Sequence, residues 1–482
     1  MELQYKSATQ LSAMLRAKEV SAVEIAESAF AQIAKTENQV DAFLTITKET
    51  AMESAKAVDA KLAKGEDIGA LAGIPIAIKD NICTKGVKTT CASKMLENFI
   101  PPYNATVMEK LNDNGAVITG KVNMDEFAMG SSCENSYFKK THNPWDLSRV
   151  PGGSSGGSAA TVAACQVPLS LGSDTGGSVR CPASLCGIVG LKPTYGTVSR
   201  FGLVAFASSL DQIGTFARTV DDTALLFNAI CGGDKMHDAT SKDYHFEKIH
   251  GDMHGVRIGL PKEYFGSGIT QEVKQSVLKA AEDLKALGAE IIEVSLPSTD
   301  YALSAYYILS SAEASSNLAR YDGVKYGYAS QNAATLNDLY LNTRSEGFGA
   351  EVKRRIMLGT YVLSSGYFDA YYKRAKILQK SISSEFDSAF AKCDVLLTPT
   401  VPYTAFKLGE KTSDPVAMYA ADICTVTVNI AGLPAVSVPC GFSENGMPIG
   451  MQLIGRKFSE SKLLSVAKCY ETMRGGFAVK EL

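Results

Sequence analysis

The residues best suited to chemistry lie in a block rich in glycine and serine between positions 151 and 182. Two clusters, Gly-Gly-Ser-Ser-Gly-Gly (152–157) and Asp-Thr-Gly-Gly-Ser (174–178), flank a segment of small and apolar residues. Glycines let a chain turn sharply, so that hydroxyl and backbone N–H groups can approach a ligand closely. A flexible linker or tight packing of small residues would have a similar composition. The helix and strand patterns between the clusters favour two loops that present serines to a ligand.

A serine hydroxyl is a weak nucleophile until a base removes its proton. Histidine is a poor candidate for that base, because four of the five histidines lie in the polar stretch 232–254, which we interpret as a surface loop. Lysine is the alternative, since burial lowers the pKa of its amine toward neutrality. Lys79 ends the apolar run 73–78 and precedes Asp80 and Asn81. Position alone leaves two roles open for Lys79: a base at the end of a buried strand, or a side chain that reaches solvent there.

Several other patterns are weaker candidates for a site. Ser155 stands in a Gly-x-Ser-x-Gly pattern, but no strand pattern precedes it and no histidine is well placed as its base. Residues 115–121 resemble a phosphate-binding loop, yet Val122 replaces the Ser or Thr that would bind magnesium. The histidines show no metal-site spacing with one another or with cysteine, so we expect no metal site. We interpret Cys181 as a small buried residue and not as a catalytic thiol.

The elements that must position these residues alternate between strands and helices. Ser7 with Gln10, and Ser21 with Glu24, have the spacing of helix capping boxes, and we expect residues 1–65 to be helical. Strands are expected over 73–78, 116–120, 256–261, 290–294 and three segments within 394–455, and helices over 106–114, 270–287 and long stretches of 300–390. This alternation predicts an α/β fold with a buried sheet.

We expect one large α/β domain over residues 1–482. The N-terminal helices occupy 1–65, a core with the Gly/Ser loops occupies 66–230, and the helical region 300–390 forms a cap or an insertion. The sequence shows no fixed-period repeat and no low-complexity linker that would divide it further.

Composition excludes some classes of function. The formal net charge is −3, from 48 basic and 51 acidic residues, and no basic run reaches five, so we expect no large nucleic-acid surface here. The 11 cysteines are an odd number without a Cys-x-x-Cys pair, which is typical of a reducing compartment. The first twenty residues lack the apolar run of a signal peptide, and no stretch is long and apolar enough for a membrane span. We therefore expect a cytoplasmic protein.

The two chemical segments resemble the amidase signature family. Residues 152–183 are similar to the family's serine–glycine motif, and Gly-Ile-Pro-Ile-Ala-Ile-Lys-Asp-Asn (73–81) is similar to its lysine motif. Within that family the chain is most similar to the glutamine-hydrolysing members that work in tRNA-dependent amidotransferases. The segments that carry this closer resemblance are 124–132, 136–146, 192–214, 346–361 and 432–441.

The resemblance implies a fold and a catalytic centre. The fold would be the amidase signature fold, a large mixed β-sheet core covered by helices on both faces. Ser178 would be the nucleophile, Lys79 the base, and Ser154 the serine between them, preceded by a cis peptide bond from Gly153. The backbone N–H groups expected to form the oxyanion hole are those of Thr175, Gly176, Gly177 and Ser178.

The resemblance also implies that 66–230 is the catalytic core and that the helical region 300–390 contributes to a pocket for glutamine. Arg355 would bind the α-carboxylate, with Tyr306 and Asp422 also in the pocket; a guanidinium suits a carboxylate and a carboxylate suits an ammonium. Arg354 and Tyr307 are adjacent alternatives. Further residues implied in the pocket lining are Met129, Gly130 and Ser131. Asp125 and Glu126 are weaker candidates for the border of an ammonia route.

The partners implied by the resemblance lie outside this chain. We expect no cofactor here, with ATP and magnesium bound by a partner B subunit that also holds most of the tRNA. The assembly would be a heterotrimer with B and C subunits, and no membrane would be involved. Two alternatives remain: a stand-alone amidase of the same family that acts on another carboxamide, or a non-catalytic relative, against which the intact Lys79, Ser154 and Ser178 count.

Overall fold

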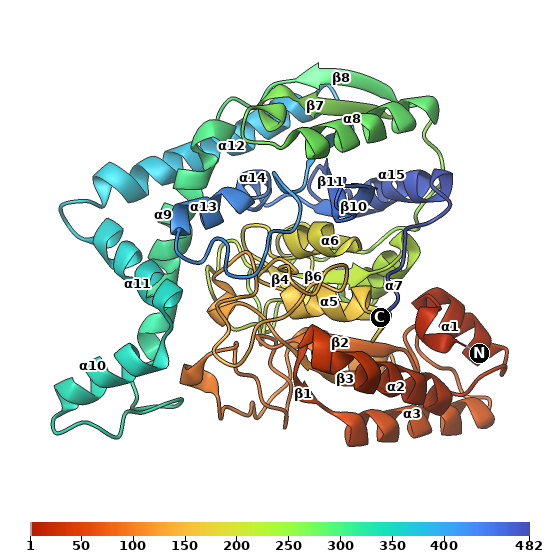
Figure 1. Cartoon of the computed structure of the whole chain (residues 1–482), viewed down its shortest axis with the longest axis horizontal. Helices are drawn as coiled ribbons and strands as arrows, with labels where there is room; N and C mark the ends of the chain where they lie inside the picture. Colours follow the sequence, from red (N-terminus) through yellow and green to blue (C-terminus); the bar gives the residue numbers. More distant parts are fainter. Residues whose placement is uncertain (1) are drawn as a thin grey trace.

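The computed structural model describes residues 2–482, and in this part of the chain it shows one mixed sheet of eleven strands (Figure 1). The strands are β1 (Phe43–Ile46), β2 (Pro75–Lys79), β3 (Val117–Val122), β4 (Leu169–Asp174), β5 (Val189–Lys192), β6 (Gln212–Ala217), β7 (Arg257–Pro261), β8 (Glu290–Val294), β9 (Val395–Pro399), β10 (Ala435–Phe442) and β11 (Pro448–Gly455). Their order across the sheet is β1-β3-β2-β4-β6-β5-β10-β11-β9-β7-β8.

The central strands bring the two chemical segments together. β2 lies between β3 and β4 and is parallel to both, with Ile78 opposite Leu171. Parallel neighbours end at the same edge of a sheet, so the ends of β2 and β4 place Lys79 and Asp174 at one edge. β4 then pairs antiparallel with β6. Both β2 and β4 are buried along their whole length, as expected for apolar strands in the middle of a sheet.

Helices surround this sheet. They are α1 (Ala8–Arg16), α2 (Ala22–Val40), α3 (Lys48–Ala63), α4 (Thr106–Asp113), α5 (Gly156–Ala163), α6 (Arg180–Cys186), α7 (Val220–Ile230), α8 (Gln271–Ala286), α9 (Thr299–Asn317), α10 (Leu336–Gly347), α11 (Ala350–Leu363), α12 (Arg374–Phe390), α13 (Pro415–Tyr419), α14 (Val426–Ala431) and α15 (Glu460–Met473). Short 3₁₀ or π turns are η1 (Leu3–Tyr5), η2 (Lys94–Leu96), η3 (Glu126–Ala128), η4 (Lys262–Phe265), η5 (Leu318–Arg320), η6 (Asp369–Lys373) and η7 (Ala420–Asp422).

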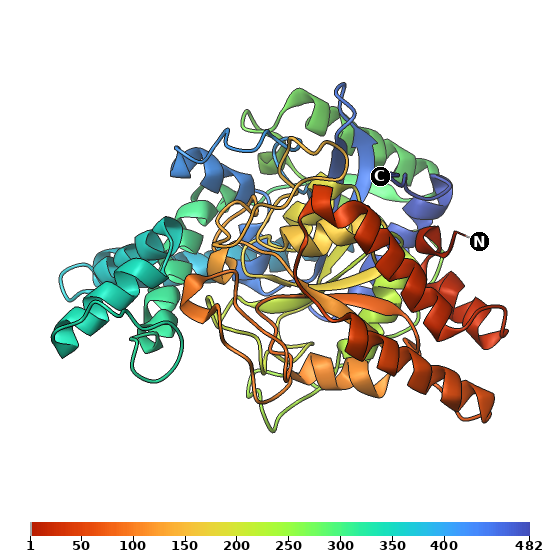
Figure 2. The same ribbon diagram turned by 60° about the horizontal axis from the view of Figure 1, so that its bottom comes forward.

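The helices cover both faces of the sheet, as the resemblance implied. α5 and α6 pack on each other and on the central strands, while α7 and α15 pack on each other and on strands from β4 to β11 (Figure 1). α8 joins α15 against β10 and β11. Figure 2 shows the N-terminal helices, in red, lying beside the sheet as a separate layer. The small residues of α5 and α6 are all buried, which allows these two helices to lie close to the strands.

The helical region after residue 298 forms an arm beside the sheet. α9 packs against α11, α12 and α14, and α10 and α11 extend away from the sheet at the left of Figure 1. Many large apolar side chains are exposed on this arm, among them Met357 and Ile377. The arm brings α11 toward the loops that follow the central strands, where the candidate site lies.

Most of the expected elements are confirmed. Both N-terminal capping boxes are present, at Ser7 and Ser21, and the long helices expected within 300–390 are α9 to α12. The expectation that residues 1–65 are entirely helical is wrong: β1 lies between α2 and α3 and pairs antiparallel with β3. β1 has only four residues, and its side-chain pattern is too short to be distinguished from that of a helix. Among residues 2–482, none of the helices is both long and apolar enough to cross a membrane.

Candidate active site

The predicted lysine and serines meet at the edge of the sheet. Lys79 is the last residue of β2, Ser154 lies in the loop before α5, and Ser178 lies in the loop between β4 and α6. Lys79 Nζ lies 2.8 Å from Ser154 Oγ and 2.8 Å from Ser155 Oγ. It also lies 2.9 Å from the Ser173 hydroxyl and 3.2 Å from the Ser173 carbonyl oxygen. Lys79 therefore points inward to hydroxyl groups, which excludes the side chain that reaches solvent.

Burial gives this lysine the pKa of a base. Lys79 is 0% exposed, and the loss of hydration lowers the pKa of its amine from 10.5 to about 7, against the opposing charges of Asp125 and Asp174. At neutral pH a large fraction of the amine is therefore unprotonated. An unprotonated amine beside Ser154 Oγ has the geometry and the protonation state of a general base.

The nucleophile candidate is the most open member of the three. Ser178 is 8% exposed, whereas Lys79 and Ser154 are completely buried. The peptide bond between Gly153 and Ser154 is cis, as the resemblance implied. The Ser155 N–H donates to the Ser178 carbonyl oxygen at 3.2 Å, so the two serine loops are joined directly. Within residues 2–482, the structure shows no hydrogen bond between the Ser154 and Ser178 hydroxyl groups.

The loop that carries Ser178 differs in one respect from the expected oxyanion hole. The Gly177 N–H donates to Asp174 Oδ1 at 2.8 Å, so it does not point at a substrate. The N–H groups of Thr175, Gly176 and Ser178 donate no hydrogen bond within residues 2–482 and stay available to an oxyanion. The expected set of four donors is therefore reduced to three, because Asp174 needs the fourth to hold the turn.

The two glycines of this loop have very close neighbours. A β-carbon on Gly176 would lie 2.4 Å from Cζ of Tyr306, and one on Gly177 would lie 2.3 Å from Oγ1 of Thr425. Gly177 also has a φ of +142°, a backbone conformation that favours glycine. Tyr306, predicted in the substrate pocket, therefore packs directly on the loop that carries Ser178.

A buried ion pair stabilises the loop that carries Ser178. Arg180 donates to Asp174 through Nε at 3.1 Å and through Nη2 at 3.0 Å, and both side chains are fully buried. Arg180 also donates to Gln452 at 2.6 Å and Asn429 at 2.5 Å. Burial alone would raise the pKa of Asp174, but the Arg180 guanidinium outweighs it and holds that pKa well below its usual range. This pair was missed from the sequence, although Asp174 and Arg180 flank the nucleophile.

Arg355 occupies a pocket beside the serine loops. It is 3% exposed, and its guanidinium carbon lies 4.3 Å from the ring centre of Tyr307 and 4.8 Å from that of Tyr419. Its Nε donates to Glu351 at 2.6 Å, while its Nη1 has no hydrogen-bond partner within residues 2–482. Both adjacent arginines line the pocket, but Arg355 is the buried one, because the Arg354 side chain is 45% exposed.

A carboxylate lies on the other side of Tyr307. The Tyr307 hydroxyl donates to Asp422 Oδ2 at 2.8 Å, and the Ser131 hydroxyl donates to Asp422 Oδ1 at 2.8 Å. Burial raises the pKa of Asp422 to about 6, so the carboxylate remains mostly charged at neutral pH. Tyr307, expected from the sequence only as an alternative to Tyr306, therefore links the cation and the anion of this pocket.

The mouth of this pocket is a cavity of about 100 Å³. Its lining includes Gly130, Ser131, Glu351, Arg354, Arg355 and Tyr419. Met129 is fully buried next to them in the chain and does not line this cavity. Glu351 and Tyr419 were missed from the sequence; the four-residue spacing of Glu351 and Arg355 on α11 was the available signal.

Two buried carboxylates hold the walls of the site. Asp125 accepts the N–H groups of Cys133 at 2.9 Å and Asn135 at 3.1 Å, and burial raises its pKa to about 7. Glu126 accepts the Gly349 N–H at 2.8 Å, at the start of α11, and burial raises its pKa to about 7 as well. These contacts give both residues a positioning role.

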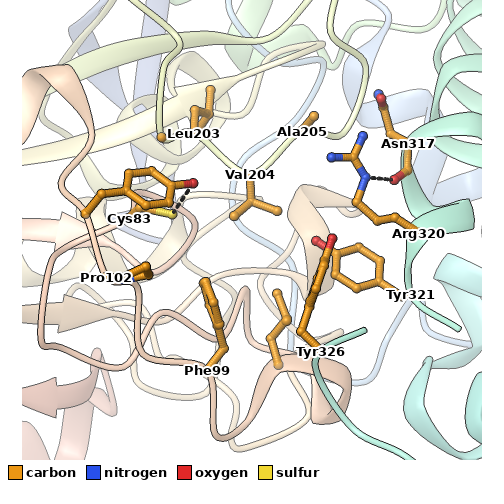
Figure 3. Close-up of a pocket in the computed structure, with 13 residues that line it drawn as sticks. Cys83, Phe99, Pro102, Leu203, Val204, Ala205, Asn317, Arg320, Tyr321 and Tyr326 are labelled. Carbon is orange, nitrogen blue, oxygen red and sulfur yellow. Dashed lines mark hydrogen bonds between the residues drawn. The ribbon is translucent and has the colours of Figure 1, made fainter. Parts of the chain in front are cut away.

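Other candidate features lie apart from the catalytic centre or lack reactive geometry. Cys181 is buried, which raises the pKa of its thiol, so it remains protonated at neutral pH. Among residues 2–482, no cluster of His, Cys, Asp and Glu could hold a metal ion. Figure 3 shows a separate cavity with Cys83, Arg320 and Tyr326 in its lining. Its volume is about 400 Å³, Tyr103 also lines it, and no residue of the predicted site does.

Comparisons with known proteins agree with this geometry. The family model described as Amidase matches residues 24–464. The chain is 59% identical to the A subunit of glutamyl-tRNA(Gln) amidotransferase from Carboxydothermus hydrogenoformans, over 98% of each chain. It is also 59% identical to the protein of the same name from a Geobacillus strain, over 96% of each chain. The crystal structure of the corresponding A subunit from Thermotoga maritima superposes with a TM-score of 0.82 at 41% identity, covering 100% of this chain and 98% of that one.

Proposed function

Because this chain belongs to the amidase family, we propose that it hydrolyses the side-chain amide of glutamine as one subunit of a Glu-tRNA(Gln) amidotransferase. The observation that carries the choice of glutamine is the buried Arg355 Nη1 that has no protein partner within residues 2–482, one tyrosine away from Asp422. An unsatisfied buried guanidinium N–H is costly unless a ligand accepts its hydrogen bond. A free amino acid offers both groups that this pocket complements, a carboxylate for Arg355 and an ammonium for Asp422.

The proposed reaction begins with two proton transfers. Unprotonated Lys79 takes the proton of the Ser154 hydroxyl, and Ser154 takes the proton of the Ser178 hydroxyl. The Ser178 oxygen forms a bond to the amide carbon, and the negative charge moves to the former carbonyl oxygen. The free N–H groups of Thr175, Gly176 and Ser178 supply hydrogen-bond donors for this oxygen.

The tetrahedral intermediate then breaks its carbon–nitrogen bond. The proton held by Lys79 returns through Ser154 to the leaving nitrogen, so ammonia departs and a glutamyl ester remains on Ser178. Water, activated by the same lysine and serine, attacks the ester and releases glutamate. The relay ends in its starting protonation state, so one glutamine and one water give one glutamate and one ammonia.

The destination of the ammonia lies outside this chain. We propose that a partner B subunit receives it through a tunnel and, with ATP and magnesium, amidates the carboxylate of a misacylated tRNA. A C subunit would complete the heterotrimer, and this chain itself would need no cofactor. The names of the relatives and the nearly even charge of this chain support this division of work. A tRNA-dependent complex of this kind would be located in the cytoplasm.

The test compares two nitrogen donors in the assembled complex. Ser178→Ala removes the nucleophile, so we expect it to abolish tRNA amidation with glutamine and to preserve amidation with added ammonium chloride. Loss of both activities would contradict the separation of glutamine hydrolysis from amidation. A wild-type chain that ignores glutamine in the complex and rapidly hydrolyses another carboxamide would instead identify a stand-alone amidase.

A further inference from the structure

Lys79 contacts more hydroxyl groups than proton transfer requires. A neutral amine has two N–H bonds and one lone pair, and only the lone pair accepts a proton. Three serines surround Lys79 Nζ within 3.2 Å: Ser154, Ser155 and Ser173. The direction of the lone pair among these three decides whether Lys79 is a base for Ser154 or merely a donor to it.

The hydrogen-bonding capacity of Ser155 is fully used. Its hydroxyl donates its one proton to the Ser173 carbonyl oxygen at 3.1 Å and accepts the Ser173 N–H at 3.3 Å. The remaining lone pair of the Ser155 oxygen faces Lys79 Nζ at 2.8 Å. Because its proton is already committed, Ser155 can only accept from Lys79, and one N–H of the amine must point to it.

Ser173 accepts the second N–H of neutral Lys79. Its carbonyl oxygen, 3.2 Å from Lys79 Nζ, has no proton to give. Its hydroxyl lies beside that carbonyl, 2.9 Å from Lys79 Nζ, and the Asn81 amide holds it in place at 2.9 Å. A lone pair turned to this side would face the carbonyl oxygen, which is repulsive, so an N–H of the amine points here as well.

Ser154 is the neighbour that remains. Within residues 2–482, Lys79 is the one hydrogen-bond partner of its hydroxyl, so the Ser154 proton is not committed elsewhere. We infer that Ser155 and Ser173 are positioning residues that take both N–H bonds of neutral Lys79 and leave its lone pair directed at the proton of Ser154. This inference rests on the proposed serine–lysine relay and adds two residues that orient its base.

The main test is Ser155→Ala in the full-length chain, assayed as glutamine hydrolysis between pH 5.5 and 9. Without the Ser155 oxygen, an N–H of Lys79 can turn to Ser154 and the lone pair can point into the vacated space. We expect kcat to fall about 10- to 100-fold, part of the roughly 10²- to 10⁴-fold that a positioned base supplies. KM for glutamine should stay within about twofold, because within residues 2–482 Ser155 forms no hydrogen bond with a residue of the Arg355 pocket.

The pH profile separates positioning from simple loss of packing. A hydrogen bond from an ammonium is stronger than one from a neutral amine, so loss of the Ser155 oxygen destabilises protonated Lys79 more. The pKa of Lys79 then falls, and the acidic limb of kcat/KM should move to lower pH by about half a unit or more. A purely structural defect would lower kcat and leave this limb in place.

Ser158→Ala is the matched control. Ser158 is also fully buried, and its hydroxyl also donates to a backbone carbonyl, that of Leu171 at 2.9 Å, but within residues 2–482 it forms no hydrogen bond with Lys79. We expect a similar loss of thermal stability with kcat and pH profile unchanged. Equal impairment of Ser158→Ala, or a Ser155→Ala chain with wild-type kcat and an unmoved acidic limb, would overturn the inference.

Ser173→Ala is a second variant with a smaller expected effect. It tests the orientation of Lys79 if Ser155→Ala does not fold. It removes the hydroxyl and keeps the carbonyl acceptor, so kcat should fall less than in Ser155→Ala and the acidic limb should again move to lower pH. An unmoved limb would contradict the inference. The proposed function can fail independently of this inference: the wild-type chain would then hydrolyse other carboxamides but not glutamine. In that case the same variants are assayed on those amides.

Discussion

The replacement of Arg355 by lysine tests how the pocket recognises its substrate. Lysine keeps the positive charge but offers one compact ammonium in place of a planar guanidinium with parallel N–H bonds. The side chain of Arg355 is 4% exposed and its Nη1 has no partner within residues 2–482, so a bound carboxylate would accept from it in a dry site. Loss of one such charge-assisted hydrogen bond costs about 1.5–3 kcal/mol. We therefore expect KM for glutamine to rise roughly 10- to 150-fold, with kcat changed much less.

The assay uses two substrates and one control variant. The second substrate is 4-aminobutanamide, which is glutamine without its α-carboxylate; Arg355→Lys should treat it nearly as the wild type does, because the lost partner is absent. Arg354→Lys is the control: Arg354 lines the same cavity, but its side chain is 45% exposed, so the change should leave KM within about threefold. The reasoning is refuted if Arg355→Lys impairs both substrates equally, or if Arg354→Lys raises KM for glutamine more than Arg355→Lys does.

Two further predictions concern buried charges. Because Lys79 must be neutral to accept a proton and burial lowers its pKa to about 7, kcat/KM should rise as the pH passes upward through about 7; a flat profile from pH 6 to 9 would exclude it as the base. Glu126→Gln should raise KM for glutamine several-fold with a smaller change in kcat, because the neutral amide accepts the Gly349 N–H less strongly and loosens the start of α11. Hydrogen exchange in α11 checks the second mechanism, and unchanged exchange together with an unchanged KM would rule it out.

Local patterns were sufficient to predict the two serine loops and the lysine that the fold brings together at the candidate site. The glycine–serine clusters and the lysine at the end of an apolar strand lie within short segments, and the parallel pairing of β2 with β4 brings them together. The order of hydroxyl groups around Lys79 could not be predicted, since it depends on where the loop before α5 passes β4. The hydrogen bond that removes Gly177 from the oxyanion hole also needs the position of Asp174.

The substrate pocket was less predictable because its parts come from distant segments. Arg355 and Glu351 lie on α11, Tyr307 lies on α9, and Tyr419 lies on α13. The stacking of Arg355 on Tyr307 and Tyr419 depends on how the helical arm packs, and no spacing along the chain encodes it. β1 was missed for a related reason, since its four residues become a strand only through pairing with β3.

The low pKa of Lys79 depends on which partners bind the two neighbouring carboxylates, Asp125 and Asp174. Asp125 and Asp174 both raise the pKa of Lys79 by their charge, yet neither forms an ion pair with it within residues 2–482. Asp125 is occupied by two backbone N–H groups, and Asp174 is occupied by Arg180 and Gly177. Direct contact with either carboxylate would hold Lys79 as an ammonium, which has no lone pair and cannot accept a proton. The partners of these two acids therefore keep the negative charges away from the Lys79 amine and let desolvation set its pKa.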